Sequence, residues 1–153
     1  MNKSFSYTSN QFSKFKYIFW SLCAVFLGGL MYSLLRPTEP VFFDWFRIAG
    51  IDNWLYTARE RTLFIGSWLP QWMVYSLPNG LWAFAYTIIV LSIWNGSSSP
   101  LKYFWFLTIP VLIFGFEILQ FTGDFPGTFC LQDITSGILG IIIGFIIVKI
   151  KPK

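Results

Sequence analysis

Four long apolar segments, almost without charge, limit what this chain can fold into. No charged residue occurs between residues 17 and 35 or between 62 and 101, and the runs 103–120 and 133–148 each hold a single acid. An apolar helix of about 20 residues crosses the hydrocarbon core of a bilayer. Only 12% of the residues are charged, whereas a soluble domain has about 25%. The sequence therefore predicts an all-α integral membrane protein, a four-helix bundle that forms a single domain over residues 1–153.

We expect the membrane spans at about 17–35, 71–94, 103–120 and 133–148. Pro37 favours a helix end after the first span, and the tripeptide at 78–80, Pro-Asn-Gly, predicts a kink in the second. The first span lacks a small-x-small cleavage site near its end, which favours an uncleaved anchor over a signal peptide.

The two kinds of basic residue lie in different connections. All four arginines fall within 36–61, and all seven acids lie in that region or around the hairpin 117–133. The lysines are Lys3, Lys14, Lys16, Lys102, Lys149, Lys151 and Lys153. Four spans put both termini on one side, and the positive-inside rule makes the lysine side cytoplasmic. The sequence predicts a multi-pass protein of a bacterial plasma or inner membrane with both termini in the cytoplasm.

The connection between the first two spans, residues 36–70, is too apolar for a solvated loop. Aromatic and aliphatic residues alternate there with charges, as in the stretch Asp44-Trp45-Phe46-Arg47-Ile48. Such a pattern is typical of helices that lie in the membrane interface. We expect one or two amphipathic helices there, on the outer side of the membrane.

Polar residues gather where the third span turns into the fourth. Glu117 and Gln120 are three residues apart, so they share one helix face, and Asp133 opens the fourth span. An acid within a span is costly and is usually functional. We therefore predict an outward-facing ligand site made of Glu117, Gln120 and Asp133, with Arg59 and Arg61 of the outer connection as the cationic partners.

The charged members of this set also have purely structural interpretations. Glu117 lies roughly 22 Å along the helix from Lys102, near the outer edge of the bilayer, where it could simply pair with an arginine. Asp133 is well placed to be a helix N-cap. Arg59 and Arg61 could extend their side chains to the interface without binding anything.

Small residues recur every fourth position in the last span. Ser136, Gly140 and Gly144 form a small-xxx-small pattern, with Gly137 beside it. Such a stripe lets another helix approach closely. We expect it to pack against the first or third span within the monomer, with homodimerisation as the alternative.

The chain contains no histidine, which removes the commonest metal ligand and the usual general base near neutral pH. No nucleophile elbow or phosphate-binding loop is present. We expect no cofactor, no metal and no catalytic residues, so that an enzyme is not favoured. The expected partners are membrane lipids, with a protein partner or a second copy of the chain as alternatives, and no nucleic acid.

The hairpin resembles the signature of the VanZ-like family of small membrane proteins. The residues in matching order are Glu117, Gln120, Pro126, Gly127, Asp133, Gly137 and Gly140. Two positions depart from the family pattern: Thr128 stands where the family has Arg, and Ser136 where it has Asn. The segment 77–82 is similar to the family's second-helix entry, although Trp82 stands at a His position. The resemblance implies a cell-envelope context, since the family's namesake is associated with teicoplanin resistance, rather than a particular reaction.

The leading functional hypothesis is a non-enzymatic envelope protein whose outward-facing polar site binds an amphiphile, a lipid headgroup or a protein partner. A small secondary transporter or carrier is the first alternative. It would need a polar path across the membrane, for which Tyr86, Thr87, Ser92 and Thr108 are the candidates. An assembly subunit of a membrane complex is the second, and an enzyme acting on envelope lipids is the third.

Overall fold

A computed structural model describes residues 3–38, 43–50, 52–125 and 128–148, with side chains described from Lys14 onward. The described parts of the chain contain helices and no strand. The helices are α1 (Lys3–Leu34), α2 (Phe43–Ile48), α3 (Asp52–Trp68), α4 (Gln71–Tyr75), α5 (Leu77–Trp94), α6 (Leu101–Thr122) and α7 (Leu131–Val148). The all-α prediction is confirmed.

Four of these helices contain segments long and apolar enough to cross a membrane. They are Lys14–Leu34 within α1, Leu77–Trp94, Leu101–Thr122 and Leu131–Val148. Half of the α5 segment is buried inside the protein, against 11–22% of the other three. Large apolar side chains that face outward therefore dominate α1, α6 and α7, as suits helices whose solvent is lipid.

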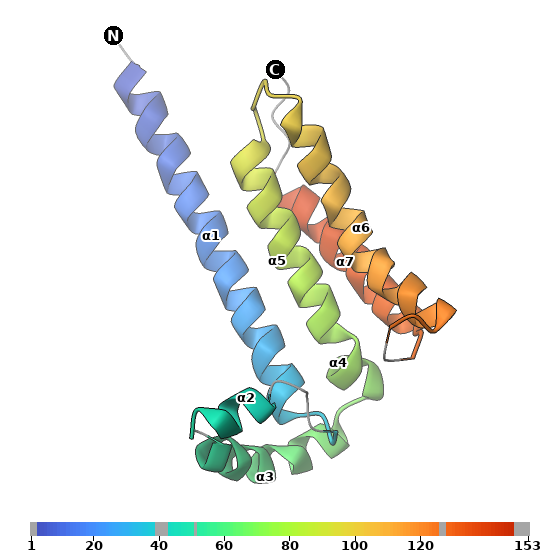
Figure 1. Ribbon diagram of the computed structural model, residues 1–153. Coiled ribbons are helices and arrows are strands. Elements are labelled where there is room, and N and C mark those ends of the chain that lie inside the picture. The colour runs from blue at the N-terminus through green and yellow to red at the C-terminus, as the bar shows by residue number, and fades with distance from the viewer. Residues whose placement is uncertain (1–2, 39–42, 51, 126–127, 149–153) are drawn as a thin grey trace.

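The long helices are arranged around α5, which packs most extensively against α7 and α1 and less against α6. Figure 1 shows α1 on one side of α5, with α6 and α7 on the other. Ile88 and Leu91 of α5 are fully buried and form a core cluster with Val148 of α7. The bundle thus has one central helix.

The small residues of α7 pack closely on α5. A methyl group at Gly140 would collide with the carbonyl oxygen of Gly80, and one at Gly144 would lie 2.8 Å from Cγ2 of Thr87. Gly80 in turn lies directly against Ser136. Gly137 instead faces α6, where a methyl group would lie 2.6 Å from Cγ2 of Ile113. The helix that the stripe mainly contacts is therefore the second span, whereas the sequence analysis expected the first or third.

The second span is divided at its outer end. A short helix, α4, precedes α5, and the break falls at Ser76 rather than at 78–80. Pro78 lies in the first turn of α5, where a missing N–H costs no hydrogen bond. The expected kink is thus a helix boundary, and α5 alone supplies the spanning segment.

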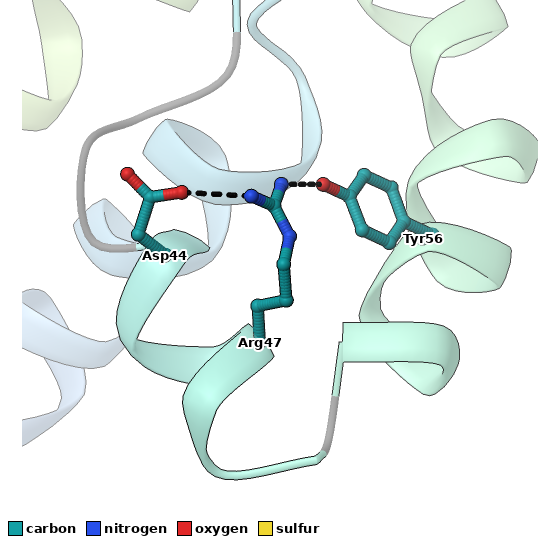
Figure 2. A network of polar contacts seen from close by, with 3 residues as sticks. All are labelled: Asp44, Arg47 and Tyr56. Carbon is teal, nitrogen blue, oxygen red and sulfur yellow. Dashed lines mark hydrogen bonds and ion pairs between the residues drawn. The ribbon is translucent and has the colours of Figure 1, made fainter.

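Two helices, α2 and α3, form the connection between the first two spans. Figure 2 shows how they are joined: Arg47 of α2 forms an ion pair of 3.0 Å with Asp44 and donates a hydrogen bond of 3.1 Å to the hydroxyl of Tyr56 on α3. Phe43 packs edge-on against the Tyr56 ring. Residues 39–42 and 51, which the prediction for this connection includes, lie outside the described residues.

The connections separate to the two ends of the bundle (Figure 1). The first turns of α1 and the α5–α6 connection lie at one end. Helices α2 and α3 lie at the other end, beside the last turn of α1, and the last turn of α6 and the first turn of α7 lie toward that same end. Lys14 and Lys102 thus lie toward one end of the bundle, and Glu117, Asp133 and the four arginines toward the other.

Candidate functional site

A pocket of about 480 Å³ opens among α1, α5, α6 and the start of α7. One part of its lining is polar and the rest is apolar or aromatic. The residues that line it are Tyr32, Arg36, Asn79, Trp82, Ala83, Tyr86, Leu112, Ile113, Phe116, Glu117, Gln120, Phe125 and Asp133. Glu117, Gln120 and Asp133, which the sequence analysis selected, therefore all reach one cavity.

Glu117 fixes the hairpin between α6 and α7. Its side chain is only 7% exposed, and Oε2 accepts a hydrogen bond of 3.1 Å from the backbone N–H of Cys130. The chain reverses after Gly123, whose φ of 81° is readily adopted by glycine. Glu117 thus acts on the connection directly and also lines the pocket.

Asp133 lies in the first turn of α7 and is not its N-cap, because the helix begins two residues earlier, at Leu131. A carboxylate in a first turn interacts favourably with the helix dipole. Its Oδ1 atom is buried and has no hydrogen-bond partner among the described residues. A buried acceptor without a partner is unusual and costly.

Arg36 is the cation of the pocket, and the sequence analysis did not select it. The guanidinium lies 4.0 Å from the centre of the Tyr32 ring, and Nη2 donates a hydrogen bond of 2.6 Å to the carbonyl oxygen of Tyr75. Its Nε is buried and has no hydrogen-bond partner in the part of the chain that the structure describes. Burial lowers the pKa of the Arg36 side chain, while Tyr32 and Asp133 act in the opposite direction. Arg36 and Asp133 thus attract one another across the cavity.

Arg59 has a different position from the one expected. It is 4% exposed and donates hydrogen bonds to three carbonyl oxygens at the end of α1: those of Ser33 (2.8 Å), Arg36 (2.6 Å) and Pro37 (3.0 Å). These carbonyls have no partner within a helix that ends there. Arg59 therefore fastens α3 to the end of α1 and does not line the pocket.

Arg61 is exposed and does not line the pocket either.

The position of Arg36 in the chain is the signal that could have identified it. Arg36 follows the first long apolar helix directly, so it lies at the same end of the bundle as the α6–α7 hairpin, and α1, which packs on α5, holds it there. Arg59 and Arg61 lie more than 20 residues further along the connection.

Most hydroxyl groups deeper in the bundle have partners within the protein. Tyr86 and Thr108 bond one another at 2.7 Å, joining α5 to α6. Thr87 and Ser92 donate to carbonyl oxygens of their own helix. These four residues are the ones that a polar path would need, and their hydrogen bonds support helix packing.

A second hollow of about 500 Å³ lies along the α5–α7 contact, between residues such as Phe84 and Leu139. Ser76, at one end, is 1% exposed and its hydroxyl has no partner. The remaining lining is mainly apolar and bears no charge. Charged groups therefore distinguish the first pocket from the second.

Among the described residues, no group of three His, Cys, Asp or Glu side chains is arranged to hold a metal ion. The first pocket contains groups that can recognise a ligand. A guanidinium, two carboxylates and two amides lie at one end, and aromatic and aliphatic side chains form the other walls. Such a mixture is characteristic of small-molecule sites, which are mainly apolar with a few convergent polar groups.

A scan of protein-family models, a search of the curated proteins and a search of the solved structures each returned no match for this chain. The geometry of the pocket is therefore the basis for assigning a function.

Proposed function

We propose that this chain is a multi-pass membrane protein of the bacterial cell envelope whose pocket binds an amphiphile at the outer face of the plasma membrane. One observation carries the proposal: charged residues and apolar walls line the same 480 Å³ cavity. A ligand with a polar head and an apolar chain matches both parts. The cavity also lies between helices that are apolar enough to be surrounded by lipid.

The polar and apolar parts are separated along the helices. Asn79 and Gln120 lie toward the end of the bundle that holds α2 and α3, while Tyr86 and Leu112 lie further along the same two helices. Eight residues separate Gln120 from Leu112, which is about 12 Å of helix. An amphiphile would therefore place its head near the membrane edge and its chain beside α6.

Helices α2 and α3 support an interfacial location for the polar end. Trp45, Trp54 and Trp68 are at least 70% exposed on them. Tryptophan is enriched where hydrocarbon meets the headgroups. In this proposal the two helices lie in the outer leaflet beside the pocket, and the lysine-bearing end faces the cytoplasm.

The resemblance to the VanZ-like family belongs to the same proposal. Glu117, Gln120 and Asp133, on which it mainly rests, line the pocket, whereas Pro126 and Gly127 lie outside the described residues. If the resemblance reflects descent, the pocket would be the part of the family pattern that binds a ligand.

Photochemical labelling tests the proposal. The full chain is reconstituted in vesicles of phosphatidylethanolamine and phosphatidylglycerol in which a rising fraction of the lipid carries a diazirine on its acyl chain, and labelled residues are mapped by mass spectrometry. We expect saturable labelling at Phe116 and Trp82. Leu112→Trp narrows the cavity and should reduce this labelling about tenfold, the effect of roughly 1.4 kcal/mol of lost affinity.

The matched control is Leu119→Trp, since Leu119 is also an exposed leucine of α6 but does not line the pocket. It should leave the labelling of Phe116 and Trp82 unchanged. Labelling that rises linearly with probe at these residues, as it would on a surface that merely contacts bulk lipid, would contradict the proposal.

A further inference from the structure

The charged groups of the pocket come from three separate helices or helix ends. Arg36 follows α1, Glu117 lies in the last turns of α6, and Asp133 lies in the first turn of α7. Two carboxylates and one guanidinium thus meet in a single cavity. Residues so far apart in sequence converge only because the whole bundle holds them there, so their joint recognition properties are those of the folded protein.

Two of these groups have opposite unmet requirements. Nε of Arg36 is a buried donor and Oδ1 of Asp133 a buried acceptor, and neither has a hydrogen-bond partner among the described residues. Because each atom lacks a partner, the two do not bond one another, although their charges attract. Both side chains also line the cavity, so a ligand there would meet the guanidinium and the carboxylate through their other atoms, as an acceptor for Arg36 and a donor for Asp133.

The two carboxylates and one guanidinium together restrict the class of ligand that the pocket can bind. A simple anion would satisfy Arg36 but would be repelled by the carboxylates of Glu117 and Asp133. A simple cation would be repelled by Arg36. A quaternary ammonium carries no N–H group and so could not supply a donor for Asp133, whereas a primary ammonium has three. Charge-assisted hydrogen bonds of this kind are among the stronger ones in proteins.

We infer that the pocket selects an amphiphile whose head carries a primary ammonium close to a phosphate, as an ethanolamine phospholipid does. This inference rests on the proposed function and names its ligand. The ammonium lies at Asp133, with Glu117 contributing charge, and the phosphate at Arg36. The amides of Asn79 and Gln120, which also line the pocket, are placed to bond the remaining head oxygens.

Competition against the photoreactive lipids tests the inference on the full chain in dodecyl maltoside micelles. The competitors are palmitoyl lysophosphatidylethanolamine, palmitoyl lysophosphatidylcholine, palmitoyl lysophosphatidic acid and free phosphoethanolamine. We expect the first to displace the label at least about tenfold more effectively than each of the others. The comparison with free phosphoethanolamine separates a lipid headgroup from a soluble zwitterion of the same chemistry.

Asp133→Asn removes the carboxylate charge while preserving the shape of the side chain. Because one charge-assisted hydrogen bond is then lost, we expect the preference for the ethanolamine lysolipid over the choline lysolipid to fall to about twofold or less. The matched control is Asp124→Asn. Asp124 lies in the same connection but is exposed and bonded to Thr122, so its replacement should leave the preference unchanged. Glu117→Gln provides a second variant if Asp133→Asn does not fold.

The outcomes separate the inference from the proposed function. Saturable pocket labelling with equal displacement by the ethanolamine and choline lysolipids would overturn the inference and leave the amphiphile site standing. Equal displacement by free phosphoethanolamine would overturn the requirement for a lipid. An identical change of preference in the Asp133 and Asp124 variants would remove the assigned role of Asp133. If the wild-type protein shows no saturable labelling, the proposed function itself fails.

Discussion

Two arginines near the end of α1 differ in their hydrogen bonds. Nη1 and Nη2 of Arg59 both donate to backbone carbonyls, and its guanidinium also lies 5.2 Å from the centre of the Phe43 ring. Arg36 has one such bond and leaves Nε without a partner. The first pattern is that of a structural residue, and the second leaves capacity for a ligand.

Replacing Arg59 tests its structural role. Arg59→Ala would leave three carbonyl oxygens without a donor in a buried site, so we expect it to destabilise the protein by about 3 kcal/mol. Arg61→Ala is the control, because Arg61 is exposed and its loss should change stability by less than about 0.5 kcal/mol. Denaturant titration of the purified protein in detergent measures both. Equal stability of the two variants would contradict the role assigned to Arg59.

At the residue scale, the sequence predicted part of the site. Glu117, Gln120 and Asp133 could be grouped because helical spacing and a short turn relate them locally. The cation could not be assigned this way, since the choice among Arg36, Arg59 and Arg61 depends on how α1 packs against α5. That packing is a tertiary property that spacing does not encode.

At the scale of helices, the contact between α5 and α7 depends on the absence of side chains. The carbonyl of Gly80 faces Gly140 so closely that no Cβ fits between them. In lipid, where apolar surface gives helices little reason to associate, close backbone approach is a main source of attraction. The contact between these helices is thus the one most sensitive to added volume.

A single methyl group tests this contact. Gly140→Ala would force α7 away from α5, and we expect a destabilisation of about 2 kcal/mol, typical of overpacking. Gly115→Ala is the control: Gly115 lies within α6 with nothing within 4 Å of its added Cβ, so helix propensity should make it neutral or slightly stabilising, by up to about 1 kcal/mol. Unfolding in detergent compares them. A Gly140 variant as stable as the wild type would show that the helices can separate without cost.

Hydropathy predicted the four apolar helices because length and composition alone define them. It could not identify the partner of the small-residue stripe, because a stripe on α7 fits any helix with a matching surface. The matching surface is Gly80, which the sequence analysis placed in a kink. Pro78, two residues before Gly80, predicts a kink within the second span, although proline is also well suited to the first turn of a helix.

At the scale of the whole molecule, orientation follows from which connections share an end of the bundle. In Figure 1, α2 and α3 and the last turn of α6 lie toward the same end of the bundle, opposite the α5–α6 connection. If the lysine-bearing end is cytoplasmic, as the positive-inside rule predicts, the pocket's charged end faces outward.

Reporter fusions test this orientation. Alkaline phosphatase fused after Gly50 should be active, because that position is expected outside, and green fluorescent protein fused after Asn95 should fluoresce in the cytoplasm. The reciprocal fusions, with the reporters exchanged, serve as controls and should both be silent. A cytoplasmic Gly50 would overturn the proposed orientation and would turn the pocket toward the inner leaflet.

The attachment of Arg59 to the end of α1 has a consequence for biogenesis. Ser33, whose carbonyl accepts one of its hydrogen bonds, is synthesised 26 residues before Arg59. The carbonyls at that end therefore have no donor from α3 until Arg59 has also left the ribosome. In the proposed membrane orientation, the last carbonyls of α1 would depend on water during that interval, which would favour keeping the end of the first helix at the membrane surface.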